Sequence, residues 1–141
     1  MSKIAVVYWS GTGNTEAMAS AVLEGAKSAG ADAVMLTPSE FDVSMLRSLD
    51  AVALGCPAMG AEVLEESEFQ PMFDTCKSQL GGKKVALFGS YGWGDGEWMR
   101  SWEKDCEQSG ISLVCESVTC CDTPDDTVKA VCRELGATLA K

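Results

Sequence analysis

A continuous apolar segment near the start of the chain, IAVVYW at residues 4–9, restricts the possible folds more than any other sequence feature. Its β-branched and aromatic residues do not alternate with polar ones, which predicts a strand buried on both faces, as in a parallel sheet. The loop SGTGNT follows directly, and helical spacing begins at Asn14 or Thr15 and ends near Gly30. This order of strand, short loop and helix is the first half of a βαβ unit.

The same alternation continues along the chain. Further strands are expected at residues 33–36, 50–56, 84–89 and 112–118, with helices near 67–79, 97–108 and from 123 onward, and a loop with a helical turn at 37–48. In the last helix, Thr123 is the expected N-cap and Pro124 the first helical residue. The pattern predicts an α/β fold, an open doubly wound sheet of five parallel strands with helices on both faces. Ligands of such sheets bind at the carboxyl ends of the strands.

The size and composition agree with a single globular domain over residues 1–141, with 46% hydrophobic and 23% charged residues. No apolar run approaches the roughly 20 residues that a membrane span needs. The N-terminus carries no cleavage pattern of a signal peptide, so we expect a cytoplasmic protein without membrane contact.

The charge balance restricts the partners. Eleven Lys and Arg against 21 Asp and Glu give a formal net charge of −10. Such a surface repels nucleic acid and anionic lipid, and it attracts proteins with a basic docking patch. The chain has no histidine and no CxxC motif, so we expect no metal site. Its seven cysteines are expected to be mostly buried small apolar residues.

The first loop has the composition of an anion-binding loop. It offers hydroxyls, an amide and backbone N–H groups at a helix N-terminus, where anions are favoured, and it comprises Ser10, Gly11, Thr12, Gly13, Asn14 and Thr15. No Lys or Arg lies between Lys3 and Lys27, so neutral donors would hold the anion. The nucleoside-triphosphate motif GxxxxGK[ST] is absent, and Glu16 interrupts GxGxxG.

Three segments of the sequence resemble those of a known family. YWSGTGNTE resembles the phosphate loop of flavodoxins, and CPAMGAE and FGSYGWGDGEWM resemble the two flavin-contacting loops of the short-chain members. The segments stand in the family's order, and the resemblance covers essentially the whole chain. It implies a flavodoxin-like strand order, 2-1-3-4-5, and non-covalently bound FMN.

The resemblance also implies roles for individual residues. Met59 would lie against the inner face of the flavin ring, Trp93 would stack on its outer face, and Glu62 would accept a hydrogen bond from the ring N3–H. The peptide between Gly60 and Ala61 would turn its carbonyl toward the ring on reduction. Besides the first loop, the full set of expected FMN contacts is Pro57, Ala58, Met59, Gly60, Ala61, Glu62, Ser90, Tyr91, Gly92, Trp93, Gly94, Asp95 and Cys121.

The implied function is low-potential one-electron transfer between the semiquinone and hydroquinone forms of FMN, by a monomer without catalytic residues. Its implied partners are redox proteins with basic patches, such as reductases and low-potential oxidoreductases. An FMN-dependent NAD(P)H:quinone reductase on the same fold is the alternative, although such an enzyme needs an open flavin face. A signalling receiver domain would need acids at the end of the first strand, where this chain has Tyr8, Trp9 and Ser10.

Overall fold

Strands and helices alternate in the computed structural model, which describes residues 2–60 and 62–141. In chain order the elements are β1 (Lys3–Tyr8), α1 (Asn14–Ser28), β2 (Asp32–Leu36), η1 (Val43–Ser48), β3 (Ala51–Gly55), α2 (Phe69–Cys76), η2 (Lys77–Gln79), β4 (Lys84–Tyr91), α3 (Glu97–Gln108), β5 (Val118–Cys121) and α4 (Asp126–Leu139). The elements η1 and η2 are 3₁₀ helices.

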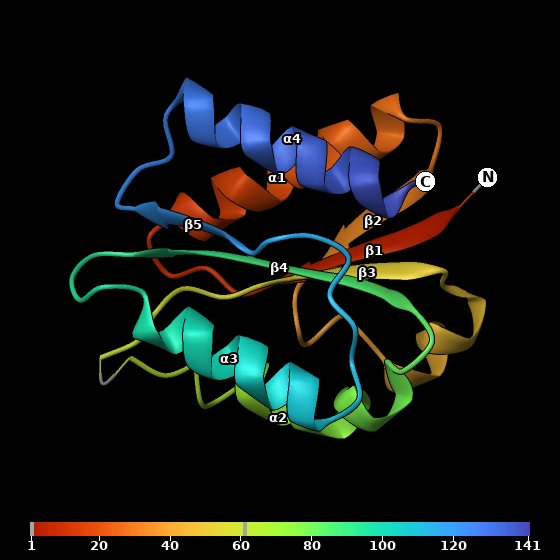
Figure 1. Ribbon diagram of the computed structural model, residues 1–141, viewed down its shortest axis with the longest axis horizontal. Helices are drawn as coiled ribbons and strands as arrows, with labels where there is room; N and C mark the ends of the chain where they lie inside the picture. The colour runs from red at the N-terminus through yellow and green to blue at the C-terminus, as the bar shows by residue number, and fades with distance from the viewer. Residues whose placement is uncertain (1, 61) are drawn as a thin grey trace.

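The five strands form one parallel sheet in the order β2-β1-β3-β4-β5. Helices α1 and α4 cover one face, and α2 and α3 cover the other (Figure 1). The predicted fold class and strand order are therefore confirmed. Because every strand runs in the same direction, the loops that follow the strands meet at one edge of the sheet, on the left in Figure 1.

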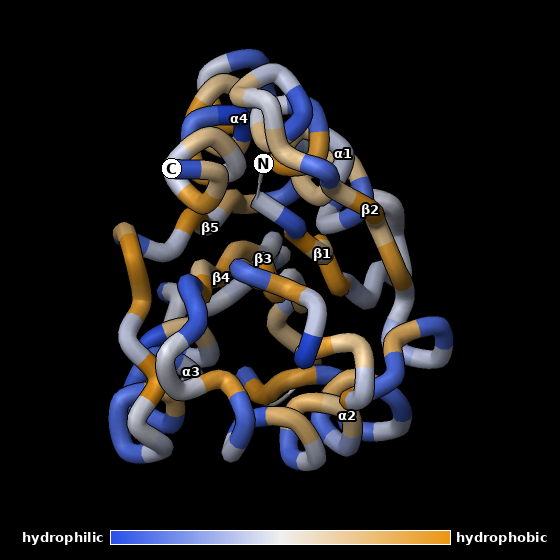
Figure 2. Tube along the Cα trace, turned by 90° about the vertical axis from the view of Figure 1, so that its right-hand side faces the viewer, coloured by the Kyte–Doolittle hydropathy of each residue, from blue (hydrophilic) through white to orange (hydrophobic). Residues whose placement is uncertain are grey.

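The central strands are buried on both faces, as the run at residues 4–9 predicts. Ile4 and Val6 pack with α1 and α4, whereas Ala5 and Val7 pack with α2 and α3. Successive side chains of a strand point to opposite faces, so one apolar run supplies both cores. Figure 2 shows this hydrophobic layer between the two pairs of helices.

The expected fifth strand at 112–118 is wrong: β5 spans Val118–Cys121 instead. Leu113 makes one isolated bridge to Val85, and Ile111 is buried in the core beside α3. In this connection Leu113 packs against the core without pairing in a ladder, whereas Val114 is exposed. An apolar pattern reports burial of side chains and not pairing of the backbone, so a buried connection can resemble a strand in the sequence.

The expected start of the last helix is also wrong. Asp125, not Thr123, is the N-cap of α4, and its carboxylate accepts a hydrogen bond of 2.9 Å from the N–H of Val128. Pro124 therefore lies before the cap and not in the first helical position. Aspartate and threonine both cap helices, so composition alone does not decide between neighbouring candidates.

The carboxylate of Glu65 organises the start of α2. This side chain is 5% exposed and accepts hydrogen bonds from the N–H groups of Ser67 (2.9 Å), Glu68 (2.7 Å) and Phe69 (2.8 Å), and from the Ser67 hydroxyl. Burial, the largest single influence, raises the pKa of Glu65, but these hydrogen bonds together outweigh it and hold the pKa below its usual value.

Five of the seven cysteines are buried, which confirms the expectation for most of them: Cys56, Cys76, Cys106, Cys120 and Cys132. Burial raises the pKa of the Cys56, Cys106 and Cys132 thiols to about 12 and that of Cys76 to about 11. Cys121 is exposed. Within the described ranges, no three or more His, Cys, Asp and Glu side chains form a group suited to a metal ion. None of the described helices is long and apolar enough to cross a bilayer.

Candidate functional site

A hollow of about 230 Å³ lies where the loops after β1, β3, β4 and β5 meet, and we call it the central hollow. Its lining comprises Trp9, Gly11, Thr12, Asn14, Pro57, Ala58, Met59, Ser90, Tyr91, Gly92 and Asp122. All but Trp9 and Asp122 belong to the predicted set, so residues far apart in the sequence converge at one edge of the sheet.

The loop after β1 folds back on its own backbone. The Ser10 hydroxyl accepts hydrogen bonds from the N–H groups of Gly13 (3.1 Å) and Glu16 (3.3 Å), so it caps the start of α1. Thr12 Oγ1 accepts a 3.5 Å bond from the Asn14 N–H. This arrangement gathers hydroxyls and amides at a helix N-terminus, where an anion is stabilised by the helix dipole.

A second hollow of about 480 Å³, the side hollow, adjoins this loop. Ser10 and Gly13 line it, and it shares Trp9, Gly11 and Thr12 with the central hollow. Neither hollow has a Lys or Arg among its described lining residues. An anion bound at the loop would therefore depend on neutral donors, as the sequence predicts.

Thr15 joins the first loop to β4. It is only 1% exposed, and its hydroxyl lies 2.8 Å from the Ser90 hydroxyl. The Ser90 N–H also donates to Thr15 Oγ1 at 3.4 Å. Thr15 is not among the described residues that line the central hollow. Its contacts with Ser90 hold the loop after β1 at a fixed distance from the end of β4.

The loop after β3 forms one wall of the central hollow through Pro57, Ala58 and Met59. The Ala58 N–H donates to the Ser90 carbonyl at 3.0 Å, and the Met59 N–H donates to the Val63 carbonyl at 2.9 Å. Gly60 follows as an exposed turn residue. Ala61 lies outside the described residues, so the expected rotation of the peptide after Gly60 stays a prediction.

Glu62 is held close to the loop after β4. Its Oε1 atom is buried and has no hydrogen-bond partner among the residues that the structure describes. Gly94 has φ +86, which favours glycine, and a Cβ there would lie 2.6 Å from this Oε1, so a larger residue would displace the end of the Glu62 side chain. Glu62 lines a small cavity of about 200 Å³ together with Trp98 and Trp102. It is not among the described residues that line the central hollow. A buried, unpartnered carboxylate oxygen requires a donor, which a ligand N–H would supply.

Trp93 is 63% exposed at the tip of the loop after β4, outside the described lining of the central hollow. The neighbouring Asp95 forms a 3.0 Å salt bridge to Arg100, and this contact raises the pKa of the Arg100 guanidinium. Arg100 also donates to the Asp95 carbonyl at 3.0 Å, which ties the loop to α3. The pairing offsets the charge of Asp95. By contrast, Trp98 and Trp102 are buried.

Two lining residues were missed at the sequence level, Trp9 and Asp122. The Trp9 indole lies against Gly11, and its Nε1–H donates to Glu68 at 3.4 Å. Asp122 follows β5 in a left-handed conformation with φ 61, and its N–H donates to the Tyr91 carbonyl at 2.8 Å. Cys121 beside it is exposed, with its thiol 3.8 Å from the Asp122 carboxylate. The position of Trp9 at the end of the first strand was the available signal, whereas the expected fifth strand ended before Asp122.

Comparisons with known proteins agree with this geometry. The sequence model of the family described as Flavodoxin matches residues 6–135. A flavodoxin from Megasphaera elsdenii is 45% identical over 138 residues, which cover 98% of both chains. A flavodoxin from Clostridium beijerinckii is 44% identical over 135 residues, covering 96% of this chain and 97% of the other. The solution structure of two-electron reduced Megasphaera elsdenii flavodoxin is similar with a TM-score of 0.89 at 44% identity, covering 97% of this chain and 98% of that one.

Proposed function

The chain belongs to the flavodoxin family of FMN-binding electron carriers, and from this premise we propose that it passes single electrons at low potential between redox proteins. In this role FMN would alternate between its one-electron and two-electron reduced forms. One observation carries the proposal: an uncharged anion loop and an unpartnered buried carboxylate oxygen occur at the same edge of the sheet.

We propose that the phosphate of FMN binds at residues 10–15. Each hydrogen bond to a charged oxygen contributes about 1.5–3 kcal/mol, and the helix dipole adds about 0.3–1 kcal/mol. Four or five neutral donors therefore suffice for a doubly charged phosphate without a lysine or arginine. The Thr15–Ser90 contact supports this role because it fixes the loop against β4.

The ring of FMN fits the side-chain chemistry of the other loops. Met59 and Tyr91 provide apolar contact surface within the central hollow, and Trp93 is the exposed aromatic side chain that we propose to cover the ring from the far side. Glu62 would accept a hydrogen bond from a ring N–H, which gives its Oε1 the donor it lacks among the described residues. The remaining predicted contacts in residues 57–62, 90–95 and Cys121 belong to the same proposal.

Bound FMN supplies the one-electron chemistry, and the protein sets the free energy of each electron. A carboxylate about 10 Å from an added negative charge costs roughly 1.7 kcal/mol at an effective dielectric constant near 20, or about 70 mV for one electron. The Glu62 carboxylate would lower the potential in this way. The salt bridge from Arg100 reduces the corresponding effect of Asp95.

We propose that partners are basic redox proteins, because the formal net charge of −10 attracts them and repels further copies of this chain. Reductases and low-potential oxidoreductases have the required chemistry. Weak, salt-dependent complexes of this kind suit a carrier that must release each partner after transfer.

The visible spectrum of the purified protein during stepwise reduction tests the proposal. We expect a yellow protein that turns blue on partial reduction. After removal of its FMN, the protein should quench the fluorescence of added FMN, while riboflavin, which lacks the phosphate, binds more weakly. Colourless protein without quenching would refute FMN binding. Steady NADH-driven quinone reduction without a reductase would instead favour the enzyme alternative.

A further inference from the structure

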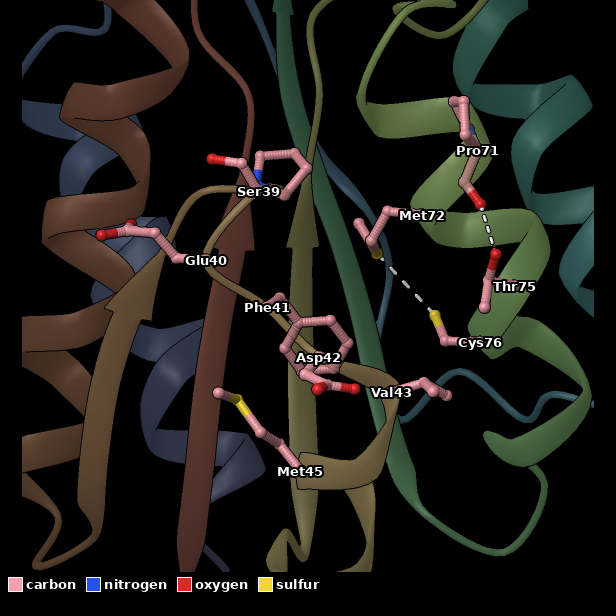
Figure 3. Close-up of a pocket in the computed structure, with 11 residues that line it drawn as sticks. Ser39, Glu40, Phe41, Asp42, Val43, Met45, Pro71, Met72, Thr75 and Cys76 are labelled. Carbon is pink, nitrogen blue, oxygen red and sulfur yellow. Dashed lines mark hydrogen bonds between the residues drawn. The ribbon is translucent and has the colours of Figure 1, made fainter.

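A groove of about 630 Å³ lies between the connection from β2 to η1 and helix α2, and we call it the α2 groove (Figure 3). The lining residues are Pro38, Ser39, Glu40, Phe41, Asp42, Val43, Met45, Pro71, Met72, Thr75 and Cys76. Its lining shares no residue with the central hollow, so the proposed FMN site does not account for it.

Both walls of the α2 groove carry apolar side chains beside polar ones. Figure 3 shows Phe41 of the connection and Val43 and Met45 of η1 on one side, and Met72 of α2 on the other. Phe41 is buried, whereas Met45 is 39% exposed and Met72 is half-buried. Flexible methionine side chains adapt to the shape of an apolar group that enters between them.

The charged residues that line the α2 groove are both acids. The carboxylate of Glu40 accepts hydrogen bonds from the N–H (2.9 Å) and hydroxyl (3.0 Å) of Thr37, and Asp42 accepts one of 3.0 Å from the Ser44 N–H. These contacts hold both charges at the rim. Lys and Arg do not occur among the described residues that line the groove.

The α2 groove continues toward the proposed FMN site. Pro38 and Ser39 line both the groove and the side hollow, to which Glu16 and Glu68 add two more carboxylates. The side hollow in turn shares lining residues with the central hollow. A protein seated in the groove therefore extends over an acidic surface to the edge where FMN would bind.

We propose that the α2 groove is a docking site for a redox partner protein that inserts an apolar side chain flanked by lysines or arginines. The proposal rests on the proposed function and names where the partner binds. Four carboxylates along the groove and the side hollow attract a cationic surface, and the apolar residues of the walls accept the side chain. A second copy of this chain, with its net charge of −10, would be repelled, as would nucleic acid.

Methyl NMR of methionine tests the docking site directly. The protein as purified, labelled at the methionine methyl groups, is titrated with a five-residue peptide that carries one leucine between two lysine pairs. A peptide with serine in place of leucine is the charge-matched control. We expect the resonances of Met45 and Met72 to shift, while those of the buried Met18 and Met99 stay fixed. Burying part of a leucine should make its peptide bind about tenfold more tightly than the serine peptide.

Two variants separate groove contacts from general charge effects. Met45→Lys adds a cation at an exposed groove position and should remove the preference for leucine; Met72→Lys repeats the test from α2. Val131→Lys makes the same charge change on α4, at an exposed position on the opposite face, and should retain the preference. With a ferredoxin-type NADPH reductase as electron donor, the groove variants should raise KM about tenfold at similar kcat, since they weaken docking alone.

The outcomes separate the alternatives. Shifts at Met59 without shifts at Met45 and Met72 would overturn the proposal, since binding would then lie at the central hollow. Equal affinity for the leucine and serine peptides would also overturn it, as would methyl shifts that depend on protein concentration without peptide, because a second copy would then occupy the groove. The NMR titrations need no electron transfer, so a failure of FMN binding would refute the proposed function and leave them unaffected, whereas the reductase assay would lose its signal in every variant.

Discussion

Replacing Glu65 by alanine should destabilise the protein through the start of α2. The change removes a buried carboxylate that accepts hydrogen bonds from the N–H groups of Ser67, Glu68 and Phe69. Loss of a helix cap costs about 0.5–2 kcal/mol, and a hydrogen bond to a charged group contributes about 1.5–3 kcal/mol. Because water will reach some of the freed N–H groups, we expect a total loss of about 2–4 kcal/mol, well above a typical surface change.

Urea denaturation of wild type, Glu65→Ala, Glu65→Gln and Glu66→Ala measures this effect. Glutamine keeps one acceptor oxygen, so its loss should be about half that of alanine. Glu66 is the exposed neighbour, and its replacement should change the free energy of unfolding by less than about 0.5 kcal/mol. If Glu65→Ala were as stable as Glu66→Ala, the capping role of the carboxylate would be refuted.

The pH dependence provides an independent check on Glu65. Its pKa is lowered in the folded protein, so the carboxylate stabilises the fold fully above the unfolded value of roughly 4.3. That contribution disappears as the pH falls through the lower, folded pKa. The stability difference between wild type and Glu65→Gln should therefore be largest above about pH 5 and shrink toward pH 3. A difference that stays constant over this range would contradict the assignment.

Three further changes test the proposed FMN site. Trp93→Ala should weaken FMN binding by roughly 2- to 13-fold, the factor expected from ring stacking, without altering the urea midpoint because the side chain is exposed; fluorescence titration giving unchanged affinity would exclude stacking. Glu62→Gln should raise the midpoint of the second electron by roughly 20–70 mV in a redox titration, and an unchanged midpoint would contradict the electrostatic account. Gly94→Ala should weaken FMN binding and lower stability by more than about 1 kcal/mol, because the residue has φ +86 and no room beside Glu62. Gly30→Ala is its matched control, with φ +93 but open space, and equal effects on FMN affinity in the two variants would refute the importance of the close approach.

The fold was predictable because its strongest signals are local. The run at residues 4–9 and the strand-to-helix alternation led to the parallel sheet, and the loop at 10–15 marked the edge where ligands bind. The error at 112–118 arose because Leu113 is apolar for packing against the core, and a buried apolar residue in a connection looks like one in a strand. A local sequence pattern does not predict which apolar segments form hydrogen-bonded pairs with a neighbouring strand.

The site was less predictable because it depends on contacts between distant segments. The hydrogen bond from Trp9 to Glu68 spans 59 residues, and the approach of Gly94 to Glu62 joins two separate loops. Asp122 lines the hollow because β5 ends beside β4, and the misplaced fifth strand concealed the position. Residue identity could suggest these groups, but only the sheet order brings them together.

The burial of the cysteines has a consequence for a carrier of reducing equivalents. With a pKa of about 12, only about one thiol in 10⁵ is ionised at neutral pH, so Cys56, Cys106 and Cys132 are nearly inert toward disulfide exchange. Disulfide formation at these three thiols is therefore slow while the carrier is exposed to oxidants. The buried thiols therefore act only as apolar side chains in the core. Oxidative damage should begin at Cys121, which is exposed to solvent.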